Sequence, residues 1–180
     1  MNAPFASRAS TVMVLLATAG LPSAAEAQYR LPTIVSTVKA DSLHEVAVGL
    51  RTAGRWRDAA RLHRRSAEFR AGEDPRGSQC LTEAAALAYA AGDRSGARTD
   101  MAHAAERALA RGDLRAAALA YLDAAWIAQE QEKPRQVWEF GHRAEILAAP
   151  PLLSESDRGV ILQRIERAPV AMRAAMRAAR

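Results

Sequence analysis

Six acidic and histidine residues have spacings that a set of helices could use to surround a metal ion. Two pairs are three residues apart, which places both side chains of a pair on one helix face. Carboxylate oxygens and imidazole nitrogens are common ligands of iron, manganese and zinc. The set comprises Glu83, Asp100, His103, Asp123, Glu139 and His142.

This set resembles the di-iron carboxylate bundles, in which two helices give a glutamate each and two give Glu-x-x-His. Helical phase argues against such a site here. At about 100° per residue, His103 is turned about 120° from Ala97, and Glu139 and His142 lie opposite Ala144. These side chains are expected to point to solvent, and the two aspartates stand where that family has glutamates. The sequence therefore predicts no metal site and no cofactor.

Cys80 is the single cysteine of the chain, so it forms no internal disulfide. We interpret it as buried helix packing, because no histidine or acid neighbours it at a motif spacing. The alternative is a free reactive thiol. Gly-x-Ser-x-Gly, phosphate loops, His-Glu-x-x-His and paired cysteines are absent from the sequence. The sequence therefore predicts no catalytic residue and a protein that is not an enzyme.

The elements that would position these side chains are amphipathic helices separated by turn residues. Ser42 and Glu45 form a capping box that predicts the start of the first helix. Glycine followed by aspartate, at Gly92-Asp93 and Gly112-Asp113, predicts a turn and a new helix cap. We expect helices at 42–54, 56–70, 78–91, 94–110, 114–130, 134–147 and 154–167, and an extended segment at 31–38.

The turns at Gly54, Gly92 and Glu132 are 38 and 40 residues apart, a period typical of helix-pair solenoids. Small residues recur in each pair, as required where helices approach to about 8 to 10 Å. The predicted repeat-packing residues are Ala47, Gly54, Trp56, Ala59, Ala67, Ala85, Gly92, Ala97, Met101, Ala104, Ala125, Val137 and Ala144.

On these residues the chain resembles the tetratricopeptide-repeat (TPR) family over 43–147. The repeat is longer than the family's roughly 34 residues, the third turn lacks glycine, and most large aromatic positions are replaced. The sequence thus predicts an all-α, TPR-like α-solenoid of about three antiparallel helix pairs. The resemblance implies a right-handed superhelix whose concave face, lined by the first helix of each pair, holds a peptide or a partner helix.

Two sets of residues follow from this arrangement. Tentative partner-binding positions on the first helices are His44, Arg51, Glu83, Tyr89, Asp123 and Gln129. The alternative is that they are ordinary solvated residues of amphipathic helices. A capping helix at 150–168 would cover the last apolar face of the array. Its expected contacts are Leu152, Leu153, Ile161, Leu162 and Ile165.

The N-terminal residues resemble a secretory leader. Arg8 precedes an uncharged run, and Ala25-Glu26-Ala27 fits the small-x-small rule of signal peptidase. The run is shorter than the roughly 20 residues that span a bilayer, although an uncleaved anchor is the alternative. We therefore interpret 1–27 as a signal peptide and 28–41 as an arm or linker. The mature chain is then exported to the periplasm or outside the cell.

Charge is unevenly distributed. Residues 51–70 hold seven bases and two acids, net +5; residues 158–180 hold six and one, net +5; residues 71–157 hold nine and fourteen, net −5. Such asymmetry favours steering of partners or head-to-tail association of copies. The basic clusters have no interleaved aromatic residues, so no nucleic-acid partner is expected.

The basic tail, 169–180, carries Met172 and Met176 on one side. As a helix it could rest on an anionic membrane or cell-wall surface, whereas the alternative is a frayed, solvated terminus. The main hypothesis is an exported, non-enzymatic adaptor of the bacterial envelope that binds a protein or peptide. The alternatives are a self-associating structural envelope protein and a metal-binding helical bundle.

Overall fold

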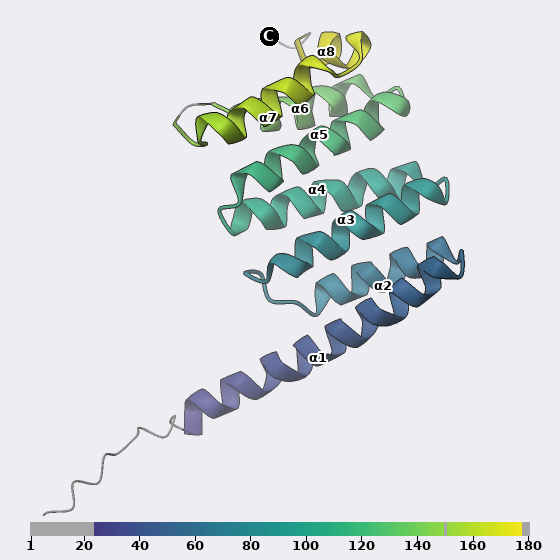
Figure 1. Cartoon of the computed structure of the whole chain (residues 1–180), viewed down its shortest axis with the longest axis vertical. Coiled ribbons are helices and arrows are strands. Elements are labelled where there is room, and N and C mark those ends of the chain that lie inside the picture. Colours follow the sequence, from purple (N-terminus) through teal and green to yellow (C-terminus); the bar gives the residue numbers. More distant parts are fainter. Residues whose placement is uncertain (1–23, 150, 178–180) are drawn as a thin grey trace, which may run out of the picture.

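The fold is an elongated stack of helices, seen in a computed structural model that describes residues 24–149 and 151–177, with side chains from residue 35 on. Eight helices and no strand occur in these ranges, and the helices from α2 to α6 each pack on the one before them in the chain (Figure 1). The helices are α1 (Ala24–Thr52), α2 (Trp56–Glu68), α3 (Pro75–Ala90), α4 (Arg94–Ala110), α5 (Leu114–Glu130), α6 (Pro134–Leu147), α7 (Glu155–Glu166) and α8 (Val170–Arg177).

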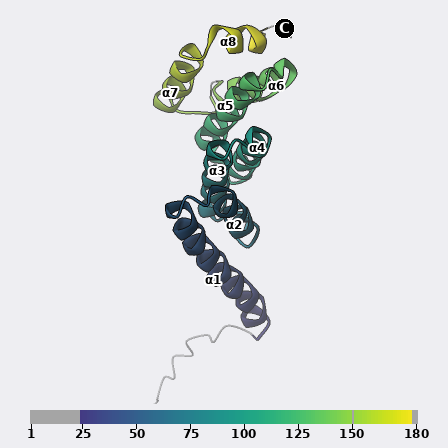
Figure 2. The ribbon, with the colours of Figure 1, turned by 90° about the vertical axis from the view of Figure 1, so that its right-hand side faces the viewer.

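The stack has two sides. Seen along its edge, α3, α5 and α7 lie on one side, and α4 and α6 lie on the other (Figure 2). This alternation follows from the short turns, which reverse the chain after each helix and leave neighbouring helices antiparallel. Helices two apart in sequence are therefore neighbours on the same side, where their side chains can meet.

Glycine and aspartate set the turns as the sequence predicts. Gly92 and Gly112 adopt left-handed backbone conformations, with φ of 82° and 77°. The side chains of Asp93 and Asp113 accept hydrogen bonds from backbone N–H groups in the first turns of α4 and α5. As a result α4, α5 and α6 have the predicted boundaries.

The turn within the third helix pair adopts the same left-handed backbone conformation without a glycine. Glu132 has a φ of 55°, the one positive φ of a non-glycine residue in the described ranges. This conformation costs a residue with a Cβ about 1 to 2 kcal/mol. The fold therefore requires the turn geometry at this place even where the sequence does not favour it.

The N-terminal expectations are wrong in two respects. Residues 31–38 are helical rather than extended, and α1 begins at Ala24 rather than Ser42. The predicted arm at 28–41 therefore lies within α1, and Ser42 and Glu45 are interior helix residues, not a cap. Burial supports the extension at least from Ala40, which is fully buried and whose carbonyl accepts a 2.7 Å hydrogen bond from Ser66 Oγ.

The core consists mainly of alanine, which allows close contact of the helix backbones. The residues predicted to pack the repeats are buried or border the core, apart from those in the turns. Trp56 is the exception: it is 44% exposed, because the first turn directs it away from the stack. Its assignment as a packing residue is wrong.

Two helices, not one, close the C-terminal end. The helix α7 contacts α5 through Ile161, which is fully buried, while Leu152 and Leu162 are 50% and 44% exposed, contrary to expectation. The helix α8 packs on α6 and buries Met172 and Met176. The methionine face expected to lie on a membrane, or to be solvated, is thus part of the core.

The predicted signal peptide lies largely outside the described residues, which begin at Ala24. Within the described ranges, no helix is both long and apolar enough to cross a bilayer.

Candidate functional site

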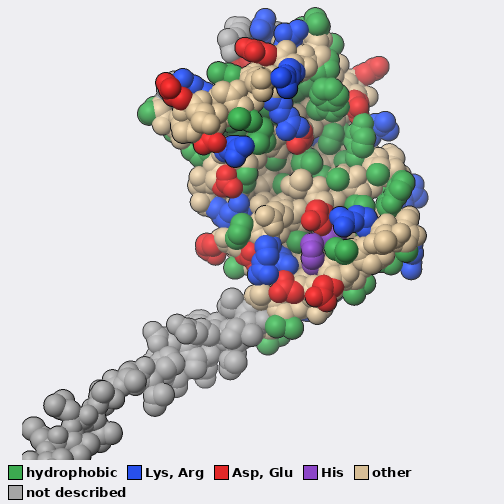
Figure 3. Space-filling model, viewed as in Figure 1, with side chains coloured by type: hydrophobic (Ala, Val, Ile, Leu, Met, Phe, Trp, Pro, Cys, Tyr) green, Lys and Arg blue, Asp and Glu red, His purple; other side chains and the backbone are tan. Residues whose placement is uncertain are grey.

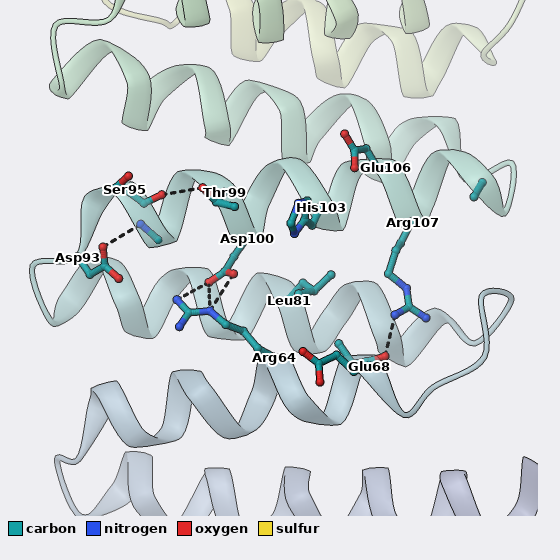
Figure 4. A pocket seen from close by; sticks show the side chains of 13 residues that line it. Arg64, Glu68, Leu81, Asp93, Ser95, Thr99, Asp100, His103, Glu106 and Arg107 are labelled. Atoms are coloured by element: carbon teal, nitrogen blue, oxygen red, sulfur yellow. Dashed lines mark hydrogen bonds and ion pairs between the residues drawn. The ribbon is translucent and has the colours of Figure 1, made fainter.

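A hollow in the described part of the molecule lies between α2 and α4. Its volume is about 850 Å³, and Figure 4 shows its polar side chains projecting from both helices. It lies on the even-numbered side of the stack, not on the face of α1, α3 and α5 that the sequence resemblance implies. The lining residues are Arg64, Ala67, Glu68, Leu81, Asp93, Ser95, Gly96, Thr99, Asp100, His103, Glu106, Arg107 and Ala110.

A closed ion pair forms one wall of this hollow. Arg64 Nε donates to both carboxylate oxygens of Asp100 at 2.9 Å, and Asp100 is almost fully buried. Burial raises the pKa of Asp100 above its ordinary value, although Arg64 acts to lower it. The hydrogen bond with Asp100 raises the pKa of Arg64 in turn. The two charges neutralise each other, and the ion pair stabilises the contact between α2 and α4.

Arg107 forms the other wall and ties α4 to the end of α2. Its guanidinium donates hydrogen bonds of 2.7, 3.0 and 2.8 Å to the carbonyls of Ala67, Arg70 and Ala71. Two of these carbonyls also accept backbone hydrogen bonds, that of Ala67 from the Arg70 N–H and that of Ala71 from the Asp74 N–H, so Arg107 adds to the hydrogen bonding of this helix end. Both arginines of the hollow are therefore engaged within the chain, whereas Glu68 has no hydrogen bond or ion pair among the described residues.

A second cluster joins α1, α2 and α3. We call His44, His63, Cys80 and Glu83 the histidine cluster. His44 Nδ1 lies 3.8 Å from Cys80 Sγ and 4.0 Å from Glu83 Oε2, and His63 Nε2 lies 3.1 Å from Glu83 Oε2. One ligand atom from each of His44, His63 and Cys80 falls within 4.8 Å of the others. Histidine reaches the surface between acidic and basic side chains in the lower part of the stack (Figure 3).

Burial in this cluster is graded. His63 and Cys80 are buried, whereas the side chains of His44 and Glu83 are 35% and 37% exposed and form the outer side. Burial lowers the pKa of His63, although Glu83 acts to raise it. The distance between His63 Nε2 and Glu83 Oε2 suits an ion pair, but the two atoms are not in hydrogen-bond geometry.

The residues predicted to bind a partner do not line one groove. His44 and Glu83 meet in the histidine cluster, and Tyr89 donates a 2.8 Å hydrogen bond to Glu130 of α5. Asp123 pairs with Arg164 of α7. The remaining two are Arg51, which is exposed, and Gln129, which is half-buried. Smaller hollows of about 380 and 340 Å³ include Glu83 and Asp123, respectively.

The six residues that could have formed a di-metal site do not meet in one cluster, although Asp100 and His103 line the same hollow. Asp100 pairs with Arg64, and Glu139 pairs with Arg143 at 3.0 Å. His142 stacks on Trp138, whereas His103 is exposed, as its helical phase predicts. Asp123 and Glu83 have the partners given above.

Sequence reasoning missed the histidine cluster because its members are far apart along the chain. His44, His63 and Cys80 are separated by 19 and 17 residues, about one helix and turn each, so the fold alone brings them together. A usable signal was present in Cys80 and Glu83, which are three residues apart and share a helix face. No histidine or acid was expected at a motif spacing from Cys80, but the fold places His44 Nδ1 3.8 Å from its sulfur. The predicted burial of Cys80 is confirmed.

No protein-family model, curated protein or solved structure matches this chain.

Proposed function

We propose that this chain is an exported TPR-like module of the cell envelope that binds a protein or peptide partner and catalyses no reaction itself. The sequential packing of antiparallel helices and the regular recurrence of left-handed turns support a repeat architecture. Such arrays expose long side-chain surfaces held by rigid helices, and this suits them to binding extended partners. The leader-like N-terminal sequence supports export.

The observation that carries the proposal is the hollow between α2 and α4. Its volume of about 850 Å³ is large enough for several side chains of a peptide. It is bounded by side chains from two rigid helices that are held together by the pair of Arg64 with Asp100 and by Arg107. A partner would therefore meet a preformed surface, which reduces the entropy lost on binding.

Charge indicates the chemistry of the partner. The lining holds four carboxylates, on Glu68, Asp93, Asp100 and Glu106, against two arginines. Arg64 pairs with Asp100, the Arg107 guanidinium is turned to backbone carbonyls, and Glu106 lies 3.9 Å from Arg143. Carboxylates still outnumber arginines in the lining, so its net charge is negative. A segment that carries arginine or lysine beside small apolar residues fits this surface best.

Site-specific photo-crosslinking tests the proposal in cells that express the full chain. A photoreactive amino acid at Thr99, which is exposed in the hollow, is expected to give one adduct of defined mass. The same amino acid at Gln163, exposed on α7, is the control and is expected not to give it. Glu68→Lys with Glu106→Lys should abolish the Thr99 adduct. Identical products from both positions, or an adduct unaffected by the charge reversal, would contradict the proposal.

Self-association is the second candidate, and α1 favours it. Val35, Val38 and Val46 are 66%, 61% and 55% exposed on this first helix, which has a neighbour in the stack on one side only. If they form an interface between copies, Val38→Asp with Val46→Asp reduces the molar mass measured by light scattering to that of one chain. Association through the basic and acidic stretches would instead weaken with salt.

A further inference from the structure

The histidine cluster contains a buried polar ring that the chain itself does not satisfy. His63 is fully buried, and neither Nδ1 nor Nε2 has a hydrogen-bond partner; Glu83 Oε2 is likewise without one. An unmade hydrogen bond of a buried group costs about 1 to 3 kcal/mol. Other buried side chains in the described ranges lack single partners, but His63 lacks both. Its nitrogens are therefore available to a partner that is not part of the protein.

The atoms around His63 are those of a transition-metal site. They comprise a second imidazole on His44, the thiol of Cys80 and the carboxylate of Glu83. Bonds of about 2.0 to 2.3 Å in a tetrahedral zinc site place the ligand atoms about 3.3 to 3.7 Å apart. Three separations within the cluster, of 3.1, 3.8 and 4.0 Å, lie near this range. The ligand atoms of His44, His63 and Cys80 all lie within 4.8 Å of one another, so the side chains must rotate to bring the more distant atoms to an ion.

We propose that His44, His63, Cys80 and Glu83 bind a divalent transition-metal ion, for which Zn²⁺ is the best match. Two nitrogens, a sulfur and a carboxylate oxygen suit its borderline-soft character, and four protein ligands complete a tetrahedral, structural site. Such an ion would link α1, α2 and α3, the first three helices of the stack. The proposal is independent of partner binding at the hollow between α2 and α4.

Surrounding side chains hold Cys80 in place. Ser66 Oγ lies 3.6 Å from Cys80 Sγ and donates its own hydrogen to the carbonyl of Ala40 at 2.7 Å. The Arg70 guanidinium, whose pKa is raised in part by the nearby Cys80, donates a 2.7 Å hydrogen bond to Asp41. Groups of this kind orient metal ligands.

The exposure of Cys80 distinguishes a metal site from a nucleophilic Cys–His pair, in which the thiol must reach a substrate. Cys80 is only 2% exposed, so the carbonyl of a substrate could not reach its sulfur without displacing α1 or α2. A metal ion is small, and the half-exposed side chains of His44 and Glu83 provide its entry from solvent. The geometry therefore favours metal binding over covalent catalysis.

Calorimetric titration of the untagged, metal-free full chain with ZnCl₂ tests the proposal. We expect about one ion per chain and a dissociation constant of about 1 µM or lower. His63→Leu should weaken binding at least about 100-fold, and Cys80→Ser and Glu83→Gln about 10- to 100-fold. His103→Leu is the matched control, because it removes an exposed histidine outside the cluster, and it should bind zinc as the native chain does.

Thermal unfolding with and without zinc provides the second measurement, and it also reports whether each variant is folded. A saturating excess of zinc should raise the Tm of the native chain by about 5 °C or more and leave that of folded His63→Leu unchanged. The proposal is overturned if zinc does not bind the native chain. Equal binding by the native chain, Cys80→Ser and Glu83→Gln would overturn it as well.

Discussion

His63 and Arg70 offer a direct comparison within one region of the fold. His63 lies within α2 and Arg70 lies two residues after its end, and both are buried beside α1 and α3. The Arg70 guanidinium donates to Asp41 at 2.7 Å and to Asp74 at 3.2 Å. The His63 ring has no such partner on either nitrogen.

The difference shows how the chain treats polar groups that it buries. Where a permanent charge enters the interior, carboxylates from the flanking helices neutralise it, because an unpaired buried charge is costly. At His63 the chain instead gathers a second imidazole, a thiol and a carboxylate without completing any hydrogen bond to the ring. The first arrangement is a closed structural contact, and the second has the chemistry of a ligand site that is open to an ion.

The largest effect is expected at Ala59, which is fully buried in α2 and belongs to the apolar core that joins α2 to α3 and α4. Ala59→Arg overpacks the contact with neighbouring helices and buries an unpaired charge, so it should lower the free energy of unfolding by about 4 kcal/mol or more. Urea unfolding followed by circular dichroism measures it, with Arg61→Ala, at an exposed position of the same helix, as control. Unchanged helicity and an unchanged midpoint would contradict the packing assignment.

Removal of Arg70 should have the next largest effect. Arg70→Met keeps the length of the side chain but leaves Asp74 with one fewer partner in a largely buried place. We expect a loss of about 2 kcal/mol in the free energy of unfolding. Arg65→Met removes an exposed arginine of the same helix and should change stability little. If both variants unfold at the same urea concentration, the Asp41–Arg70–Asp74 contact is not stabilising.

Replacement of His63 should not lower the free energy of unfolding of the metal-free protein, in contrast to replacement of Arg70. His63→Leu removes two buried nitrogens that lack hydrogen bonds and fills similar space, so stability should be unchanged or higher by about 1 kcal/mol. Urea unfolding in the presence of EDTA measures this. A loss as large as that of Arg70→Met would mean that the ring makes stabilising contacts within the chain, and the comparison would then break down.

The smallest effect concerns pH. Burial acts to raise the pKa of Asp74, but hydrogen bonds from Arg76 and Arg70 hold it below its ordinary value of 3.8. The carboxylate therefore stabilises the fold above this pH, and the contribution disappears as the pH falls through the lower folded-state value. Asp74→Asn retains a capping oxygen for α3 and should cost about 1 kcal/mol near neutral pH.

The difference between Asp74→Asn and the native chain should be smaller at about pH 2 than near neutral pH, because protonation of the native carboxylate progressively removes its contribution. Urea midpoints at the two pH values test this. A pH-independent difference would mean that the amide disturbs the cap itself rather than the charge.

Much of the fold could be predicted from local sequence. The boundaries of α4, α5 and α6 follow from glycine, aspartate and proline at the turns, because these residues act on the backbone next to them. Glu132 shows where local rules end, since its left-handed backbone is imposed by the packing of the flanking helices. The extension of α1 before Ser42 could not be read from the capping box, because a serine followed by glutamate is equally compatible with a helix interior.

The histidine cluster depends on distant parts of the chain and was therefore harder to predict. Cys80 and Glu83 share a helix face, but His44 and His63 approach them only after α1, α2 and α3 have packed. The chain has four histidines, and local spacing singles out His103 and His142, because each has an acid three residues away. Spacing within one helix identifies pairs of residues on that helix, whereas the histidine cluster draws its residues from α1, α2 and α3.

X-ray absorption of the zinc-loaded full chain tests most directly whether the histidine cluster is a metal site, because it reports the atoms that bind the ion. The account predicts one sulfur at about 2.3 Å and about three nitrogen or oxygen neighbours at about 2.0 to 2.1 Å, with the sulfur shell lost in Cys80→Ser. A spectrum that contains only nitrogen and oxygen shells, or one unchanged in that variant, would contradict it. Zinc would then occupy some other surface, and the open polar cluster at His63 would remain without its partner.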